Sequence, residues 1–266
     1  MTLSKTEKSI SGFTLVELAI VMIIIGLLVG GILKGQQLVA NARMAGLISK
    51  IREIDTANLT FLDVYRAVPG DMKNATTRLP GCTVDSSCIN GNGDRILGVG
   101  PISYVTHQPW MDVAATIDSE NVQYWKHLSL AGMIGGLNGG AAEIDWGQTH
   151  PTGVMRGGFH ARSSVAPPGY GSMNGLTLVF RNYLDGVWHC GGGESTGDGC
   201  AVDPVEAYRI DQKMDDGQAY SGVVQSISGN WSYGCGLANT GRNGPDGYDR
   251  NGTERLCDMM FKVKEY

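Results

Sequence analysis

The longest apolar segment of the chain, FTLVELAIVMIIIGLLVGGIL at residues 13–33, restricts the fold more than any other feature. A helix over these residues would be about 31 Å long, close to the hydrocarbon thickness of a bilayer. Lys5 and Lys8 precede the segment, and most acidic residues follow it, so we expect the N-terminus on the cytoplasmic side. The segment therefore predicts one membrane-spanning helix.

Two ordinary explanations of this segment are a secretory signal peptide and a plain membrane anchor. A signal peptide has a shorter apolar region, of about 7–15 residues, that ends in small residues. Here the segment is longer, and Lys34-Gly-Gln-Gln follows it. A plain anchor fits the length but leaves Glu17 unexplained, because a charge inside a membrane helix is unfavourable. Glu17 is therefore either an acid tolerated near the interface or the partner of a cation.

The residues Gly12-Phe13-Thr14-Leu15-Val16-Glu17 resemble the class III signal of type IV pilins and type II secretion pseudopilins. That family has a basic leader, a glycine before the cleaved bond, Phe, three further residues, Glu and an apolar helix. The resemblance implies cleavage between Gly12 and Phe13 by a prepilin peptidase, followed by N-methylation of Phe13. It also implies that Glu17 pairs with the new amine of a neighbouring subunit, since a buried charge is tolerated only when paired.

For function, the resemblance implies a structural subunit of a type IV pilus or a type II secretion pseudopilus, and not an enzyme. Its partners would be copies of itself or other pilins, the prepilin peptidase and the inner-membrane assembly platform. The precursor would span the bacterial inner membrane, N-in and C-out, before it enters a periplasmic or cell-surface filament. One alternative is a minor or tip pilin that binds a surface, a glycan or secreted cargo. Another is a membrane-tethered periplasmic enzyme.

Composition and motifs argue against several other classes of protein, namely nucleic-acid binders, common enzymes and collagen. Lys and Arg total 21 against 26 Asp and Glu, a net charge of −5, so we expect no nucleic-acid binding. The five histidines lack H-E-x-x-H spacing, and the sequence has neither a P-loop nor a G-x-S-x-G motif. The 39 glycines have no three-residue period, which excludes collagen. The sequence therefore gives no catalytic residues and no required cofactor.

Apolar residues continue beyond the membrane segment at steps of mostly three or four, which indicates a helical stripe. The stripe comprises positions 38, 42, 45, 48, 51, 54, 59, 62 and 65. Val68-Pro69-Gly70 ends it, so we expect one helix from about Phe13 to Arg66. Gly26 and Gly30 form a G-x-x-x-G pattern that suits either a close helix contact or a flexible point.

The sequence predicts an α+β fold in which this helix packs on a glycine-rich antiparallel sheet with disulfide-closed loops, as in pilins. The predicted segments are a leader (1–12), a transmembrane helix (13–33), an amphipathic continuation (34–66) and an extracytoplasmic body (67–266). Within the body we expect helices at 119–131 and 203–217, and strands at 176–184, 221–227 and 259–263. Segments at 68–71, 90–94, 125–132 and 210–217 resemble recurring segments of large-bodied pilin-like proteins.

Six cysteines follow the membrane segment, at Cys82, Cys88, Cys190, Cys200, Cys235 and Cys257. None has zinc-site spacing, and an exported body favours three disulfides. Of the fifteen possible pairings we favour 82–88, 190–200 and 235–257, because each pair brackets a loop rich in Gly or Asn. Free buried thiols are the alternative.

Two loops carry oxygen side chains suited to calcium. Asn90, Asn92 and Asp94 alternate with glycines, as in the first half of a calcium loop, but the later ligand positions do not match. Asp246 and Asp249 lie in a second loop, and major pseudopilins bind calcium in a C-terminal loop. A polar turn without metal is the preferred interpretation of both, with the first turn held by the nearby 82–88 disulfide.

Overall fold

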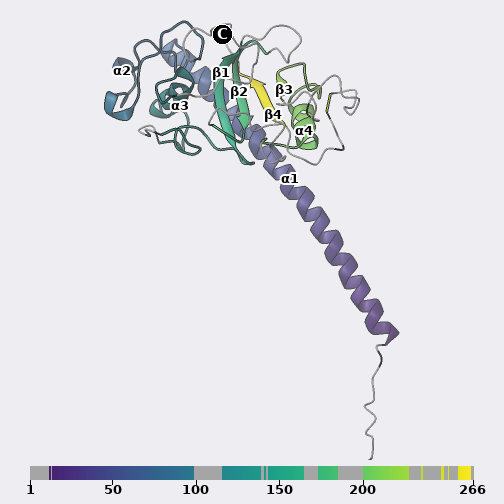
Figure 1. The fold of residues 1–266 in the computed structure, drawn as a ribbon. Coiled ribbons are helices and arrows are strands. Elements are labelled where there is room, and N and C mark those ends of the chain that lie inside the picture. The colour runs from purple at the N-terminus through teal and green to yellow at the C-terminus, as the bar shows by residue number, and fades with distance from the viewer. Residues whose placement is uncertain are drawn as a thin grey trace, which may run out of the picture. The chain divides into compact units, whose positions relative to one another are not determined.

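The computed structural model describes residues 12, 14–98, 116–138, 141, 143–164, 173–184, 200–227, 235, 247, 248, 251 and 257–264. The chain divides into two compact units, Met1–Arg43 and Met44–Tyr266, and each is described by itself. One helix, α1 (Leu15–Tyr65), contributes residues to both units and is drawn from purple to blue in Figure 1.

The helix α1 confirms the long helix predicted from Phe13 to Arg66. It ends at Tyr65, because Arg66 takes a left-handed φ of 56° and Pro69 follows three residues later. Proline lacks an N–H and restricts the residue before it, so the helix cannot continue through this point.

The buried stripe of α1 differs in part from the predicted one. Ile48, Ile51 and Ile54 are buried as expected, but the predicted positions 38, 42 and 45 are exposed, and Met44 and Leu47 are buried instead. Farther along, the buried side chains are Asn58 and Phe61, whereas the predicted positions 59 and 62 are only half-buried. The prediction counted apolar residues alone, so it missed Asn58, whose buried amide binds the main chain of Lys264, near the C-terminal end of the sequence.

The second unit contains a four-stranded antiparallel sheet in the order β1-β2-β4-β3. The strands are β1 (Gly158–Ser164), β2 (Gly175–Arg181), β3 (Val224–Ile227) and β4 (Asp258–Lys262). Leu178 of β2 and Val224 of β3 both lie opposite Phe261 of β4, which places β4 between them. The sheet and α1 together confirm the predicted α+β, pilin-like fold.

The remaining helices of this unit are α2 (Ala75–Arg78), a short 3-10 turn (Val84–Ser86), α3 (Glu120–Leu130) and α4 (Pro204–Met214). The two longer ones lie within the helices predicted at 119–131 and 203–217. α4 begins with a full capping box, in which Asp203 and Glu206 each accept a main-chain N–H of the other. Strand β1 was not predicted.

The core of the second unit lies between α1 and the sheet. Ile51 and Phe61 of α1 belong to the same buried cluster as Phe159, Leu178 and Phe261 of the sheet. The second half of α1 is therefore a core element, and the body folds around it.

Two disulfides close loops of this unit, Cys82–Cys88 and Cys235–Cys257, and both are pairs that the loop spacing favoured. Cys200 is also disulfide-bonded, but Cys190, its expected partner, lies outside the described residues. None of the described cysteines is free, so the interpretation as free thiols does not hold for them.

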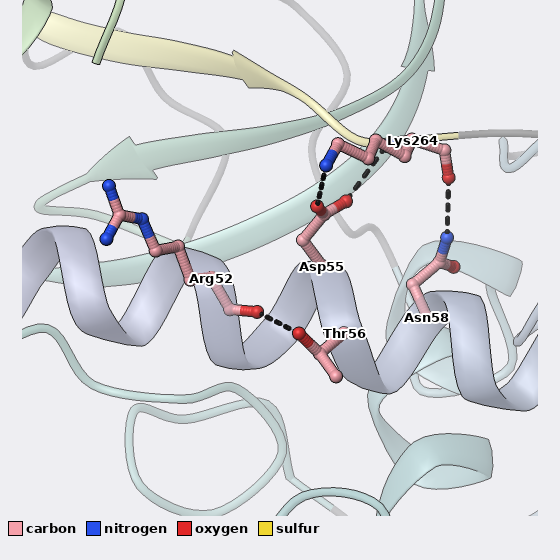
Figure 2. A network of polar contacts seen from close by, with 5 residues as sticks. All are labelled: Arg52, Asp55, Thr56, Asn58 and Lys264. Carbon is pink, nitrogen blue, oxygen red and sulfur yellow. Dashed lines mark hydrogen bonds and ion pairs between the residues drawn. The ribbon is translucent and has the colours of Figure 1, made fainter.

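Polar contacts fasten α1 to the chain that follows β4 (Figure 2). Asp55 accepts the main-chain N–H of Lys264 at 2.9 Å, and the Nδ2 of Asn58 donates to the Lys264 carbonyl at 3.2 Å. The hydroxyl of Tyr124 on α3 donates to the Oδ1 of Asn58 at 3.4 Å. Asn58 therefore links three parts of the unit through one buried amide.

Candidate functional site

The first turn of α1 forms a capping box between Thr14 and Glu17. The Thr14 hydroxyl accepts the main-chain N–H of Glu17 at 3.3 Å, and a Glu17 carboxylate oxygen accepts the main-chain N–H of Thr14 at 2.9 Å. The Thr14 hydroxyl also lies 2.9 Å from that oxygen and donates to it. Two otherwise unpaired N–H groups of the helix start are thereby satisfied. Thr14 was not among the predicted site residues, although T-x-x-E is the sequence signature of such a box.

The part of α1 that follows Glu17 exposes a continuous apolar surface. Leu18 is 51% exposed, Leu27 73% and Leu33 62%. By length and composition α1 can cross a membrane, and none of its most apolar window is buried within the chain. A Cβ added at Gly26, Gly30 or Gly31 would have no atom within 4 Å. This surface is therefore free to contact lipid or other helices.

The predicted processing site lies at the start of this segment. Gly12 is exposed, whereas Phe13 lies outside the described residues. An exposed glycine before the bond is accessible to a peptidase.

A second site forms where the Asn90–Asp94 loop wraps around Asp71. The Asp71 carboxylate accepts the main-chain N–H groups of Gly93, Asp94 and Arg95. Gly91 also donates its main-chain N–H to the carbonyl of the neighbouring Met72, at 3.0 Å. A side chain at position 91 would collide with the main chain of Asp71, so the close approach requires glycine. Asp71, with the Met72 carbonyl, thus holds this loop by direct contact, which the sequence did not predict.

Three carboxylates meet at this loop, from Asp71, Asp94 and Glu120, with oxygens within 4.8 Å of one another. Burial raises the pKa of Asp71 and of Glu120, and the neighbouring carboxylates raise it further. An open pocket of about 370 Å³ lies beside them, lined by Asn90, Gly91, Asn92, Gly98, Thr116, Asp118, Ser119 and Glu120. Their oxygens are of the kind that calcium prefers.

Hydrogen bonds within the loop already use these oxygens. Both Asp71 oxygens accept main-chain N–H groups, and Glu120 accepts the N–H of Asn92 at 2.9 Å. The two Asp94 oxygens accept from Ile96 and from the Asn92 side chain. These hydrogen bonds are sufficient to hold the loop as a polar turn without a metal ion. Calcium binding at Asn90, Asn92 and Asp94 therefore stays a prediction.

Asp246 and Asp249, the predicted ligands in the second calcium loop, lie outside the described residues. Tyr248, which lies between them in the sequence, is buried and donates its hydroxyl to Asp211 at 2.8 Å. Burial raises the pKa of Asp211 to about 6. Asp215 and Asp216 lie beside Asp211, and each binds main-chain N–H groups of the segment that leads into β3. This acidic group therefore organises the α4–β3 turn.

Comparison with known proteins identifies a family motif in the N-terminal segment. Residues 8–33 match the model of the prokaryotic N-terminal methylation motif. The chain therefore carries, over these residues, the motif that is the class III signal of type IV pilins and pseudopilins. No curated protein and no solved structure matches the chain.

Proposed function

We propose that the chain is a structural subunit of a type IV pilin-like filament, either a pilus or a type II secretion pseudopilus. Prepilin peptidase would cleave between Gly12 and Phe13, and the mature helix would enter the filament. The precursor would span the bacterial inner membrane, N-in and C-out. The methylation motif at residues 8–33 and the exposed apolar surface of α1 support this proposal.

The observation that carries the proposal is the place of Glu17. Its carboxylate lies in the first turn of a helix whose following residues are apolar and exposed. Cleavage would create a positive amine at Phe13, and burial of either charge among apolar helices is unfavourable without a partner. The docking of a second subunit supplies that partner, so Glu17 would set the register of assembly.

A Glu17→Val variant tests this role. We expect normal cleavage and membrane insertion, and a loss of filaments in the sheared fraction, measured against the processed protein left in the membrane. Glu53→Val is the matched control, because Glu53 lies on the same helix beyond the apolar segment and its ion pair with Lys50 is exposed. Normal filament yield from the Glu17→Val cells would contradict the proposal.

The alternative is a minor or tip pilin whose body binds a surface, a glycan or secreted cargo. The open pocket beside Glu120 is the feature of the described body that favours it. Abundance separates the two roles, since a major subunit dominates sheared filaments and a tip protein is scarce. Quantitative mass spectrometry of sheared filaments measures this directly.

A further inference from the structure

One face of α3 binds the main chain of the loop closed by Cys82 and Cys88. Gln123, Lys126 and His127 share this face, because residues three and four apart are neighbours on a helix. All three side chains are buried, although polar residues of these types are usually exposed. Their burial therefore requires partners, and Ser86 and Ser87 of the loop, together with the adjacent Ile89, provide most of them.

Lys126 places its ammonium group in a cage of carbonyl oxygens. The Nζ donates to the carbonyls of Ser86 and Ser87 at 3.1 Å each and to the carbonyl of Ala141 at 2.8 Å. An ammonium group has three N–H donors, so each has an acceptor. Burial lowers the pKa of Lys126, and the charge of Asp118 opposes this shift.

Gln123 and His127 bind the same short stretch of chain. Gln123 accepts the N–H of Ile89 at 3.1 Å and donates to the Ser87 carbonyl at 2.9 Å. The Nε2 of His127 lies 3.0 Å from the Ile89 carbonyl, and its Nδ1 accepts the N–H of Gly70 at 2.8 Å. Because Nδ1 accepts, Nε2 carries the proton and donates to Ile89. Cys88 therefore lies between Ser87 and Ile89, and the main chain of both residues is hydrogen-bonded to side chains of α3.

The bound loop contains an unfavourable backbone conformation. Ser87 has a φ of 51°, in the left-handed region that residues with a Cβ rarely adopt. Its carbonyl accepts hydrogen bonds from both Lys126 and Gln123. These bonds stabilise a conformation that the five residues between the cysteines would seldom take in a free loop.

We propose that this face of α3 is a template that places Cys88 opposite Cys82 and selects their pairing among the six cysteines, with Lys126 as its main positioning residue. The two thiols lose two protons and two electrons as the S–S bond forms. A disulfide oxidant accepts them and is itself reduced to two thiols. The disulfide then closes a loop that α3 has already ordered, and the proposal does not depend on which filament the chain enters.

Equilibrium with glutathione tests the template in the full chain in detergent micelles. Alkylation and mass spectrometry give the effective concentration of each thiol pair from its oxidised fraction. We expect Lys126→Met to lower the effective concentration for Cys82–Cys88 by about tenfold or more, because it removes three charge-assisted hydrogen bonds. Cys235–Cys257 in the same molecule serves as an internal reference and should change by less than about twofold. Lys213→Met, at an exposed position of α4, should change neither pair.

An unchanged Cys82–Cys88 pair in Lys126→Met would overturn the proposal, as would an equal fall at both pairs. A second measurement uses Cys82→Ala/Cys88→Ala, in which the α3 face is intact. If α3 orders the loop, the main-chain amides of Ile89 and Gly70 stay protected from hydrogen exchange without the disulfide. If they lose protection, with or without the amides of the sheet, the disulfide orders the loop and the proposal is wrong.

Discussion

The Asp55 carboxylate lies closer to the main-chain N–H of Lys264 than to the charged end of the Lys264 side chain. The Asp55 carboxylate accepts the Lys264 N–H at 2.9 Å, whereas the Lys264 Nζ lies 3.9 Å from the other oxygen. The lysine side chain is 75% exposed and that of Asp55 only 21% (Figure 2). Exposed ion pairs contribute little, so the main-chain hydrogen bond is the important part of this contact.

Substitutions at the two residues should therefore have unequal effects. We expect Asp55→Ala to lower the free energy of unfolding by about 1–2 kcal/mol, because it leaves the Lys264 N–H without its acceptor. Lys264→Ala keeps that N–H and should cost less than about 0.5 kcal/mol. Urea unfolding of the two full-length variants in detergent measures the difference. Equal losses would show that the ion pair is the main contribution.

Asp71 should be essential for the Asn90–Asp94 loop. We expect Asp71→Ala to lower the free energy of unfolding by about 2–4 kcal/mol, because three main-chain N–H groups lose one shared acceptor. Thermal unfolding measures this loss, and Asp85→Ala, at an exposed position of the disulfide loop, is the control. A loss at Asp71 no larger than at Asp85 would mean that other contacts hold the loop.

Calcium distinguishes the two interpretations of the same loop. Because the oxygens of Asp71, Asp94 and Glu120 already accept hydrogen bonds, we expect no heat and no thermal shift when micromolar calcium is added to the full chain. Titration calorimetry of the protein and of Asp94→Ala measures this. Saturable heat that Asp94→Ala abolishes would establish a calcium site.

His127 should make the free energy of unfolding decrease at acid pH. Burial lowers the pKa of His127 to about 4, well below the value near 6.5 of an unfolded chain. As the pH falls from 6.5 to 4, the unfolded state binds a proton that the folded state does not, so the free energy of unfolding decreases. The Nδ1 of His127 cannot take that proton while it accepts the Gly70 N–H.

His127→Gln removes this proton uptake, so its stability should approach that of the parent as the pH falls through this range. Burial raises the pKa of Asp258 to about 6, an opposite effect that both proteins share and that cancels in the comparison. Urea unfolding at several pH values measures the difference in stability. A difference that is constant between pH 7 and pH 4 would contradict this assignment.

Local sequence signals predicted the elements that depend on nearby residues. The apolar run and the later stripe predicted α1, and Asp203-Pro204 with Glu206 predicted the start of α4. Strand β1 was missed although Phe159, His160, Ala161 and Arg162 alternate between apolar and polar, because the strand contains no Val, Ile or Thr.

The contacts that build the two sites were predictable to different degrees. Thr14 is three residues from Glu17, and the capping-box pattern was present in the sequence. Asp71 and Arg95 are far apart in the chain, and nothing local to either residue indicates their contact. The same holds for Lys126 and Ser86, which meet only because the disulfide loop packs on α3.

The N-terminus of the protein purified from cell membranes tests the central claim most directly. Intact-mass and N-terminal peptide analysis would identify the first residue and any methyl group on its amine. The class III signal predicts a chain that begins at N-methylated Phe13, with residues 1–12 removed. A chain that retains Met1 and an uncut Gly12–Phe13 bond, in cells with an active prepilin peptidase, would contradict the account.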